Sequence, residues 1–285
     1  MRLIGLTCVA MLAFAANSVL NRMAVGAGQI DPVVFAVVRL ATGAAVLGAL
    51  LVWRGTIWRG TIWRGTNWPG TIWPGWAGRV PGVVGLLVYL FGFSLAYLAL
   101  DAGTGALILF GVVQVTMFVG AWLSGEALPA RRMAGAALAL AGLVVLLAPK
   151  GGAILPELAM AVAGVGWGIY SLAGRWQSDA LAATAWNFML ALPIGLGALL
   201  LWPGHWTTAG VVLAMVSGGV TSGLGYALWY VVVPQLGAGR AAVAQLTVPL
   251  IATAGGFALI GEVPGTEFWA AAALVIGGVA WGLRR

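Results

Sequence analysis

The chain has 285 residues, of which 62% are apolar and only 7% are charged. A soluble domain carries about 25% charged residues, so a water-soluble fold would have too few of them to cover its surface. The formal net charge of +7 comes from scattered arginines and not from a dense basic face, which argues against nucleic acid as a partner. The composition therefore predicts a membrane protein whose outer surface contacts the lipid bilayer.

Ten apolar runs of about 20 residues follow one another along the chain, each long enough to span a membrane as a helix. A membrane barrel would instead show short alternating segments. The first run resembles a secretory signal, but it continues to Ala24 and has a counterpart later in the chain, so we expect a span. The predicted helices cover residues 2–24, 32–52, 80–100, 103–122, 131–148, 157–175, 182–201, 210–233, 239–260 and 267–283.

The second five runs repeat the pattern of the first five. Residues 100–147 align without gaps on residues 236–283, which places Glu126 on Glu262. We expect each glutamate to lie in an interhelical turn and to bond the start of the next helix. An odd number of helices per repeat turns the second copy upside down in the membrane. The prediction is an all-α membrane protein with two inverted five-helix repeats, residues 1–150 and 151–285, around a central cavity.

Loop charges predict the orientation of the chain. With a cytoplasmic N-terminus, eleven lysines and arginines, among them Arg79, fall in cytoplasmic segments, and only Arg22 and Lys150 lie outside. This positive-inside bias predicts that both termini lie in the cytoplasm. Residues 53–79 form a predicted cytoplasmic loop of RGTIW-type pentapeptides. We expect a tolerated insertion there, and a lipid-contacting gate is the alternative.

Two residue types are notable for their scarcity. The lone Cys8 excludes an internal disulfide, and we expect it to be a buried apolar side chain. His205 lies in a WPGHW turn with no second histidine or cysteine nearby, so we predict a loop residue and no metal site. No P-loop, nucleophile elbow or HExxH motif occurs. We therefore expect no enzyme activity and no cofactor.

Polar side chains within the runs are functional candidates, because they are costly in hydrocarbon. Arg39 is the first, since a guanidinium binds a carboxylate with two parallel hydrogen bonds; alternatively it snorkels or pairs with Asp31 or backbone carbonyls. Pro249 predicts a kink at a gate or a purely architectural bend. The other predicted cavity residues, each of which has interhelical bonding or packing as its alternative role, are Asn17, Asn21, Tyr89, Tyr97, Gln114, Trp167, Tyr170, Ser222, Tyr226, Tyr230 and Gln245.

Several segments resemble the drug/metabolite transporter superfamily in its EamA-like ten-helix branch. They are GEALPARRMAGAALALAGLVVLL (125–147), its copy GEVPGTEFWAAAALVIGGVAWGL (261–283), FAANSVLNR (14–22) and PVVFAVVRLATGAAVL (32–47). The resemblance covers most of both halves except the pentapeptide loop. It implies a basket-like bundle, a cavity lined by helices 1, 3, 4, 6, 8 and 9, and export by alternating access. YddG-type exporters of aromatic amino acids are similar in size and topology.

Together with the polar and aromatic candidates, this resemblance implies export of amino acids with aromatic or other apolar side chains across a bacterial inner membrane. No acidic residue lies near the centre of a run, so we expect uniport by a monomer rather than proton coupling. Arg39 or helix N-termini would bind the carboxylate, and the amide oxygens of Asn17, Gln114 or Gln245 the ammonium. One alternative is another metabolite, such as a nucleobase or a cationic drug. Another is a non-transporting sensor or scaffold, which a sealed core would favour.

Overall fold

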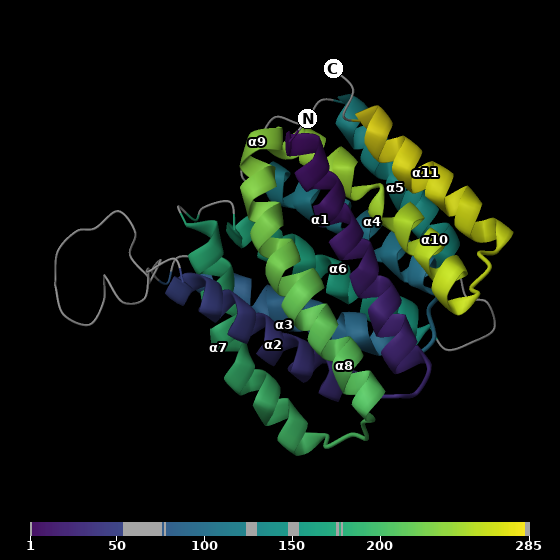
Figure 1. The fold of residues 1–285 in the computed structure, drawn as a ribbon. Coiled ribbons are helices and arrows are strands. Elements are labelled where there is room, and N and C mark those ends of the chain that lie inside the picture. The colour runs from purple at the N-terminus through teal and green to yellow at the C-terminus, as the bar shows by residue number, and fades with distance from the viewer. Residues whose placement is uncertain are drawn as a thin grey trace, which may run out of the picture.

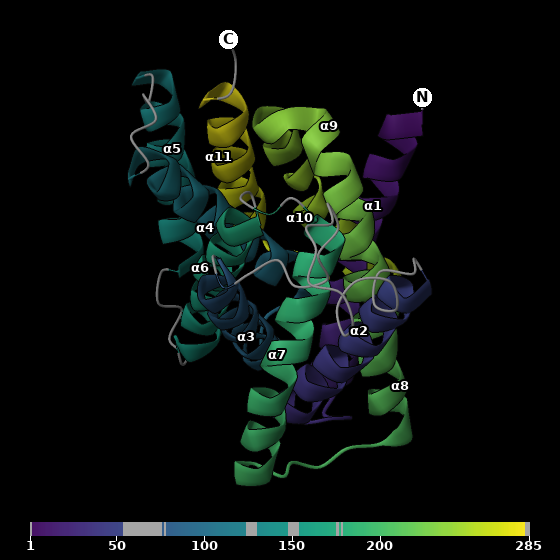
Figure 2. The same cartoon turned by 90° about the vertical axis from the view of Figure 1, so that its left-hand side faces the viewer.

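A computed structural model describes residues 2–53, 76, 78–123, 130–147, 154–174, 177 and 179–282. The described chain folds into one helical bundle, in which α1 begins and α11 ends at the same end (Figures 1 and 2). An isolated antiparallel bridge joins Ile30 to Trp206. The elements, with η for π-helix, are α1 (Arg2–Asn21), η1 (Arg22–Gly26), α2 (Pro32–Trp53), α3 (Arg79–Ala96), α4 (Ala102–Leu123), α5 (Ala130–Leu147), α6 (Leu155–Gly174), α7 (Ala180–Leu201), α8 (Thr208–Val216), η2 (Ser217–Leu224), α9 (Gly225–Gln245), α10 (Val248–Ile260) and α11 (Thr266–Gly282).

Local sequence explains several helix ends. The side chains of Asp179 and Thr207 accept hydrogen bonds from backbone N–H groups three residues later, at 3.0 and 3.1 Å, and so cap α7 and α8. Pro32 opens α2, where its missing N–H costs nothing. Gly261 ends α10 with a φ of 72°, a left-handed conformation that glycine adopts most readily.

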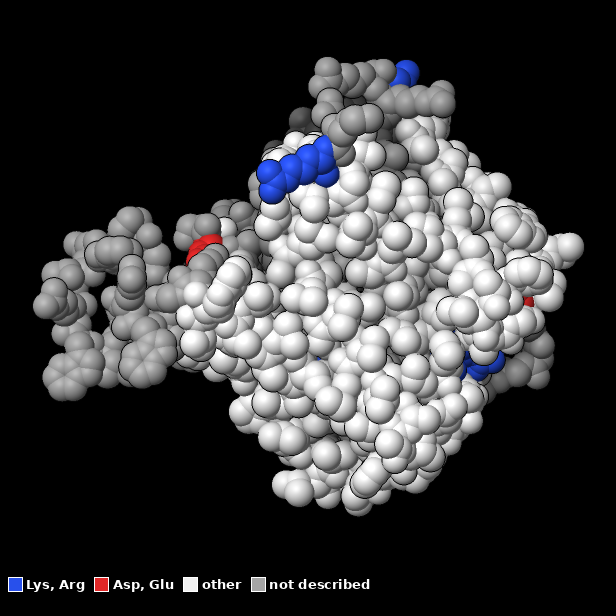
Figure 3. All heavy atoms as spheres, in the orientation of Figure 1, with Lys and Arg blue, Asp and Glu red and all other residues white. Residues whose placement is uncertain are grey.

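The outer surface of the bundle is apolar. Seven of the described helices are long and apolar enough to cross a membrane, and α10, α11 and part of α5 are shorter apolar helices. Large side chains such as Leu12, Val162 and Leu259 are exposed on the outside. The face in Figure 3 carries almost no charge away from its margins. Such a surface suits contact with lipid chains, and polar groups are correspondingly gathered inside.

Close helix contacts hold the bundle together. The main pairs are α3 with α6, α5 with α11, α4 with α10 and α2 with α7. In the α3–α6 pair, a Cβ added at Gly85 would lie 2.7 Å from the carbonyl oxygen of Gly166, and one at Gly166 would lie 2.7 Å from that of Gly85. Glycine at both positions lets the two backbones touch, as is common in membrane helix packing.

Most helices begin and end within about four residues of the predicted runs, but the last part of the chain differs. The prediction placed a break between residues 233 and 239, whereas α9 continues through position 234 to Gln245. Prolines occur inside membrane helices because neighbouring groups satisfy the freed backbone. The actual break lies at Leu246–Thr247, so Pro249 stands in the first turn of α10 and not in the middle of a helix.

For two further residues, the solvent exposure differs from the one predicted. Cys8 is exposed on the outside of α1 rather than buried. Arg79, expected as a loop charge, is only 1% exposed in the first turn of α3. Its Nη1 donates to the Ala183 carbonyl at 2.6 Å and to Asn187 Oδ1 at 2.8 Å, so it ties α3 to α7. The pentapeptide repeats between positions 54 and 75, Glu126, Lys150 and the position of Arg175 lie outside the described residues.

Candidate functional site

Arg39 lies on α2 inside the bundle, and its side chain is fully buried. Its Nε donates to the Ser222 hydroxyl at 2.9 Å, and its Nη2 donates to the hydroxyls of Tyr89 and Tyr226 at 2.8 and 3.1 Å. The guanidinium carbon lies 5.1 and 5.0 Å from the ring centres of Tyr89 and Phe93, within cation–π range. Within the described residues, every partner of this charge is neutral.

The environment of Arg39 stabilises its charge without cancelling it. A buried guanidinium is costly in an apolar interior unless its N–H groups are bonded. Three hydroxyls and two rings offset part of that cost, but Nη1 has no hydrogen-bond partner among the described residues. Arg39 therefore leaves a net positive charge, with unused donors, inside the bundle.

The π-helix η2 brings a third helix against Arg39. A Cβ added at Gly218 would collide with the Arg39 carbonyl oxygen and with the hydroxyl of Thr42. Glycine at this position therefore allows η2 to lie directly on α2. π-Helical segments of this kind are frequent at functional sites. The apolar run at 210–233 predicts ordinary helix here, although the glycine-rich sequence SGGVTSGL indicates an unusual helix geometry.

Hydroxyls of η2 also bind α1. Ser217 and Ser222 donate to Asn17 Oδ1 at 2.8 and 3.4 Å, and Thr221 donates to the same oxygen. Ser222 is thus bonded both to Arg39 and to Asn17. A single polar network consequently connects α1, α2, α3 and the η2–α9 segment.

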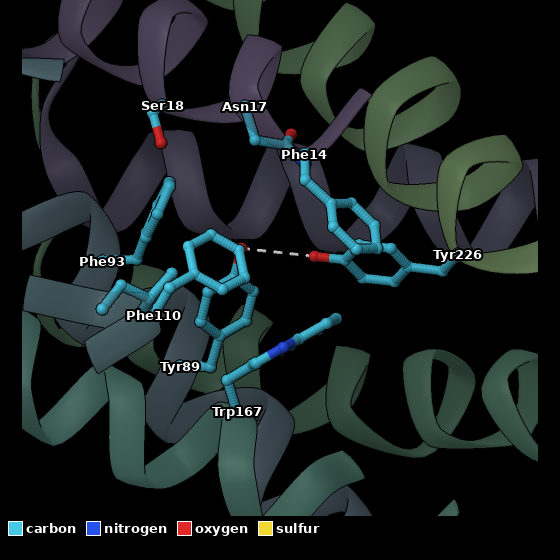
Figure 4. A pocket seen from close by; sticks show the side chains of 9 residues that line it. Phe14, Asn17, Ser18, Tyr89, Phe93, Phe110, Trp167 and Tyr226 are labelled. Carbon is cyan, nitrogen blue, oxygen red and sulfur yellow. Dashed lines mark hydrogen bonds between the residues drawn. The ribbon is translucent and has the colours of Figure 1, made fainter. Parts of the chain in front are cut away.

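A small pocket lies beside this network (Figure 4). Trp167 packs against two tyrosines, and its ring centre lies 4.9 Å from those of both Tyr89 and Tyr226. The Tyr226 hydroxyl donates to that of Tyr89 at 3.3 Å, the dashed line in Figure 4. The lining residues are mostly aromatic: Phe14, Asn17, Ser18, Tyr89, Phe93, Leu109, Phe110, Trp167 and Tyr226.

The pocket is small in this conformation. It has room for about one water molecule, which needs roughly 10–15 Å³. The rings that line it contact one another, for example Phe14 and Tyr226 with centres 5.7 Å apart. This conformation is therefore closed around the site, and a metabolite enters only if these rings separate.

Six of the residues proposed from sequence come together in the network and pocket: Asn17, Arg39, Tyr89, Trp167, Ser222 and Tyr226. Arg39 is not itself a lining residue, because the tyrosine hydroxyls stand between its guanidinium and the pocket. Tyr170 lies behind the wall, stacked on Trp167 at 5.3 Å and bonded to the Thr184 hydroxyl at 3.2 Å. Their roles toward a substrate stay predictions.

The remaining candidates lie elsewhere. Asn21 donates to the Ser94 hydroxyl at 3.2 Å, and Tyr97, just past the end of α3, donates to the Ala102 carbonyl at 3.2 Å. The side chain of Tyr230 lies outside the described part of the structure. The candidates that also lie outside the pocket lining are Gln114 on α4, Gln245 at the end of α9 and Pro249 in α10.

Sequence reasoning missed several site residues. Helical spacing was an available signal, since Phe14 and Ser18 are four residues apart beside Asn17, and Phe93 follows Tyr89 by four. No sequence signal separated these phenylalanines from others that face lipid. The missed lining residues are Phe14, Ser18, Phe93, Leu109 and Phe110, and the missed network residues are Ser217 and Thr221.

A second charged cluster lies at the end of α1. Arg22 Nε donates to Glu262 Oε1 at 2.7 Å, its Nη1 donates to two carbonyls of the α3–α4 loop at 3.4 Å, and Asp101 lies 3.9 Å from its Nη2. The other oxygen of Glu262 accepts from the Ala102 N–H at 2.8 Å. Glu262 thus caps a helix, as expected, but the helix is α4 and not α11, the next one along the chain.

His205 joins two loops near the same bridge that pairs Ile30 with Trp206. Its Nε2 lies 2.8 Å from the Gly28 carbonyl oxygen, and its Nδ1 lies 3.2 Å from Asp31 Oδ2. The hydrogen bond to Gly28 and the charge of Asp31 raise the pKa of His205, because both favour the protonated ring. In the described part of the chain, no group of three His, Cys, Asp or Glu side chains is placed to hold a metal ion.

Comparison with known proteins agrees with this architecture. A crystal structure that covers 98% of this chain and 96% of its own superposes with a TM-score of 0.68 at 24% identity, which supports the fold alone. The uncharacterized protein PA1977 of Pseudomonas aeruginosa is 42% identical over 285 residues, covering 98% of this chain and 93% of that protein.

Two matches carry functional descriptions. The aromatic amino acid exporter YddG of Ancylobacter novellus is 30% identical over 220 residues, covering 72% of this chain and 75% of that protein. Residues 154–283 match the EamA-like transporter family. Together with the apolar helices, these matches make the protein a multi-pass membrane transporter. The chain belongs to the EamA-like transporter family.

Proposed function

We propose that this protein exports amino acids with aromatic or other apolar side chains across the bacterial inner membrane by alternating access. The observation that carries the proposal is the position of a fully buried, acid-free arginine network beside a pocket walled by aromatic rings. The relative named as an aromatic amino acid exporter supports this substrate class. The uncompensated charge of Arg39 disfavours a cationic drug as cargo.

The geometry of the pocket supports a more specific role for each residue within this proposal. The carboxylate of the substrate belongs on the Arg39 side of the pocket, and its ring packs among Phe14, Phe93 and Trp167. The Asn17 amide oxygen already accepts three hydroxyl donors, so it binds an ammonium only if those bonds are released. Gln114 and Gln245 reach the substrate only in a conformation other than the closed one.

The helix contacts support two inverted five-helix repeats. α2 packs on α7, α4 on α10 and α5 on α11, so each helix contacts the one that the sequence repeat pairs with it. α3 packs on α6 and α1 packs on η2 and α9, contacts that an exchange of the two halves interconverts. Such a pseudo-twofold arrangement is the usual basis for alternating access in secondary transporters.

Uniport and orientation complete the proposal. No acidic residue lines the pocket, so we infer that substrate moves down its own gradient without a proton carrier. The Lys and Arg distribution supports a cytoplasmic position for both termini. The Arg22–Glu262 cluster then lies at the periplasmic end, where it ties η1 to the α10–α11 loop.

The experiment is a flux assay in proteoliposomes with labelled phenylalanine, about twenty competing amino acids, a nucleobase and a cationic drug. We expect saturable phenylalanine flux that aromatic amino acids inhibit and that collapse of a pH gradient barely changes. Flux of the nucleobase or drug without phenylalanine flux would assign another substrate. Strict dependence on the pH gradient would refute uniport, and no flux of any compound would favour a sensor or scaffold.

A further inference from the structure

In the hydrogen-bond network beside the pocket, one tyrosine hydroxyl has a proton that is not donated to any described residue. Arg39 donates to both tyrosines, and Tyr226 donates to Tyr89. A hydroxyl carries a single proton, so the proton of Tyr89 has no acceptor among the described residues. In this arrangement, the Tyr89 hydroxyl on the pocket wall remains able to donate.

Two other lining residues also present donors. Trp167 Nε1 is buried without a hydrogen-bond partner in the described part of the chain, and its ring contacts both tyrosines. Asn17 has its amide oxygen occupied by three hydroxyls, so its NH₂ group is the half of the side chain left for a ligand. The indole, the amide and the tyrosine hydroxyl all belong to the lining of one pocket.

Acceptors for a cationic group are scarce by comparison. The nine lining residues include no Asp or Glu, and beyond the tyrosines Ser18 supplies the one further hydroxyl. Arg39 lies behind the tyrosine hydroxyls with its charge uncompensated, and a second cation nearby would be repelled. The site as a whole therefore favours an anion over an ammonium ion.

We infer that this pocket binds aromatic monocarboxylates whether or not they carry an amino group. The Trp167 N–H, the spare tyrosine proton and the Asn17 NH₂ donate to the carboxylate, and the phenylalanines pack on the ligand's ring. Arg39 is a positioning residue, which orients the tyrosine hydroxyls and supplies the opposite charge. The inference rests on the pocket of the proposed function and extends its substrate class.

Three ligands with one phenyl ring test this: phenylalanine, 3-phenylpropionate and 2-phenylethylamine. Equilibrium dialysis measures their Kd for the purified full chain in detergent, and flux of phenylalanine is followed separately. We expect the Kd of 3-phenylpropionate to be within about threefold of that of phenylalanine, and 2-phenylethylamine to bind at least tenfold more weakly, because the charged hydrogen bonds come from the carboxylate.

Trp167→Phe keeps an aromatic ring and removes the N–H. It should weaken both carboxylates about tenfold and leave the amine unchanged, whereas Trp122→Phe, on the exposed side of α4, should change nothing. The inference is overturned if 2-phenylethylamine binds as tightly as 3-phenylpropionate, if 3-phenylpropionate binds more than tenfold weaker than phenylalanine, or if Trp167→Phe has no effect. Binding of both carboxylates without phenylalanine flux would sink only the amino-acid export proposal.

Discussion

Arg22 and Arg39 both carry a charge in an apolar bundle, but their charges are stabilised in different ways. Arg22, 23% exposed at the end of α1, is paired with Glu262 and lies near Asp101. Arg39 is fully buried and is held by Ser222, Tyr89 and Tyr226, all of them neutral. A charge that is neutralised by an acidic side chain holds helices together. A charge with only neutral partners can still attract an anion. Under the proposed function, Arg22 is therefore architectural and Arg39 attracts the carboxylate of the substrate.

Neutralising Arg39 is expected to have the largest effect. Arg39→Gln should lower phenylalanine flux about 10- to 100-fold, because it removes the positive charge near the carboxylate and the charged hydrogen bonds that orient the tyrosine hydroxyls, each of which contributes about 1.5–3 kcal/mol. Arg39→Lys keeps the charge but loses the planar fork, so its loss should be smaller. Initial rates in proteoliposomes measure both. Arg22→Gln is the matched control, and an equal loss of flux in that variant would remove the contrast between the two arginines.

The second-largest effect is expected where η2 packs closely on α2. Gly218→Ala places a methyl group against the Arg39 backbone and Thr42, and overpacking of this kind costs about 1–3 kcal/mol. We expect a lower Tm in detergent together with weaker substrate binding. Gly197→Ala in α7, where an added Cβ meets nothing within 4 Å, is the control. A Gly218→Ala protein with unchanged Tm would mean that η2 has room to move away.

Removing the charge of Glu262 tests whether the Arg22–Glu262 ion pair contributes to stability only. Glu262→Gln loses the ionic bond from Arg22 and keeps an acceptor for the Ala102 N–H, so we expect a loss of about 1 kcal/mol in unfolding free energy. Substrate affinity should not change. The check is the Tm set beside the Kd for phenylalanine, and a large change in Kd at constant Tm would give Glu262 a place in the transport cycle.

A smaller effect should follow pH at the His205 contact. Because Gly28 and Asp31 raise the pKa of His205, the protonated ring stabilises the contact fully below the pKa of the unfolded chain, about 6.5. That stabilisation is lost as pH rises through the raised value. The hydrogen-exchange protection factors of the backbone N–H groups of Asp31 and Thr207, which are corrected for the intrinsic pH dependence of exchange, should therefore fall above that pH. His205→Gln should abolish the dependence, and an unchanged profile would contradict this assignment.

The smallest effect is expected from the pentapeptide loop. Deletion of residues 59–70 should leave phenylalanine flux and Tm nearly unchanged, because insertions in loops between packed elements are usually tolerated. Flux per correctly inserted molecule is the measurement. A deletion variant that inserts normally and does not transport would make the loop part of the gate.

The sequence by itself determined the class of molecule. In a run of about 20 apolar residues within a membrane, a helix satisfies the hydrogen bonds of the backbone N–H and C=O groups. Each run is a local property of the chain and can be read from the sequence. It also singled out Arg39, because a charge in such a run is exceptional, and gathered a polar set in which Asn17, Trp167 and Tyr226 proved to be neighbours. Composition and residue spacing were enough to predict the features that depend on neighbouring residues in the chain.

Tertiary structure decided the chemistry of the site. The partners of Arg39 come from α3 and the η2–α9 segment, 50 to 187 residues away in sequence, and no local pattern reports such contacts. The same holds for Arg79, which became buried because α7 offers it a carbonyl and an amide oxygen. Which donors stay free in the pocket depends on how these separate helices meet, since hydrogen bonds are satisfied in three dimensions and not along the chain.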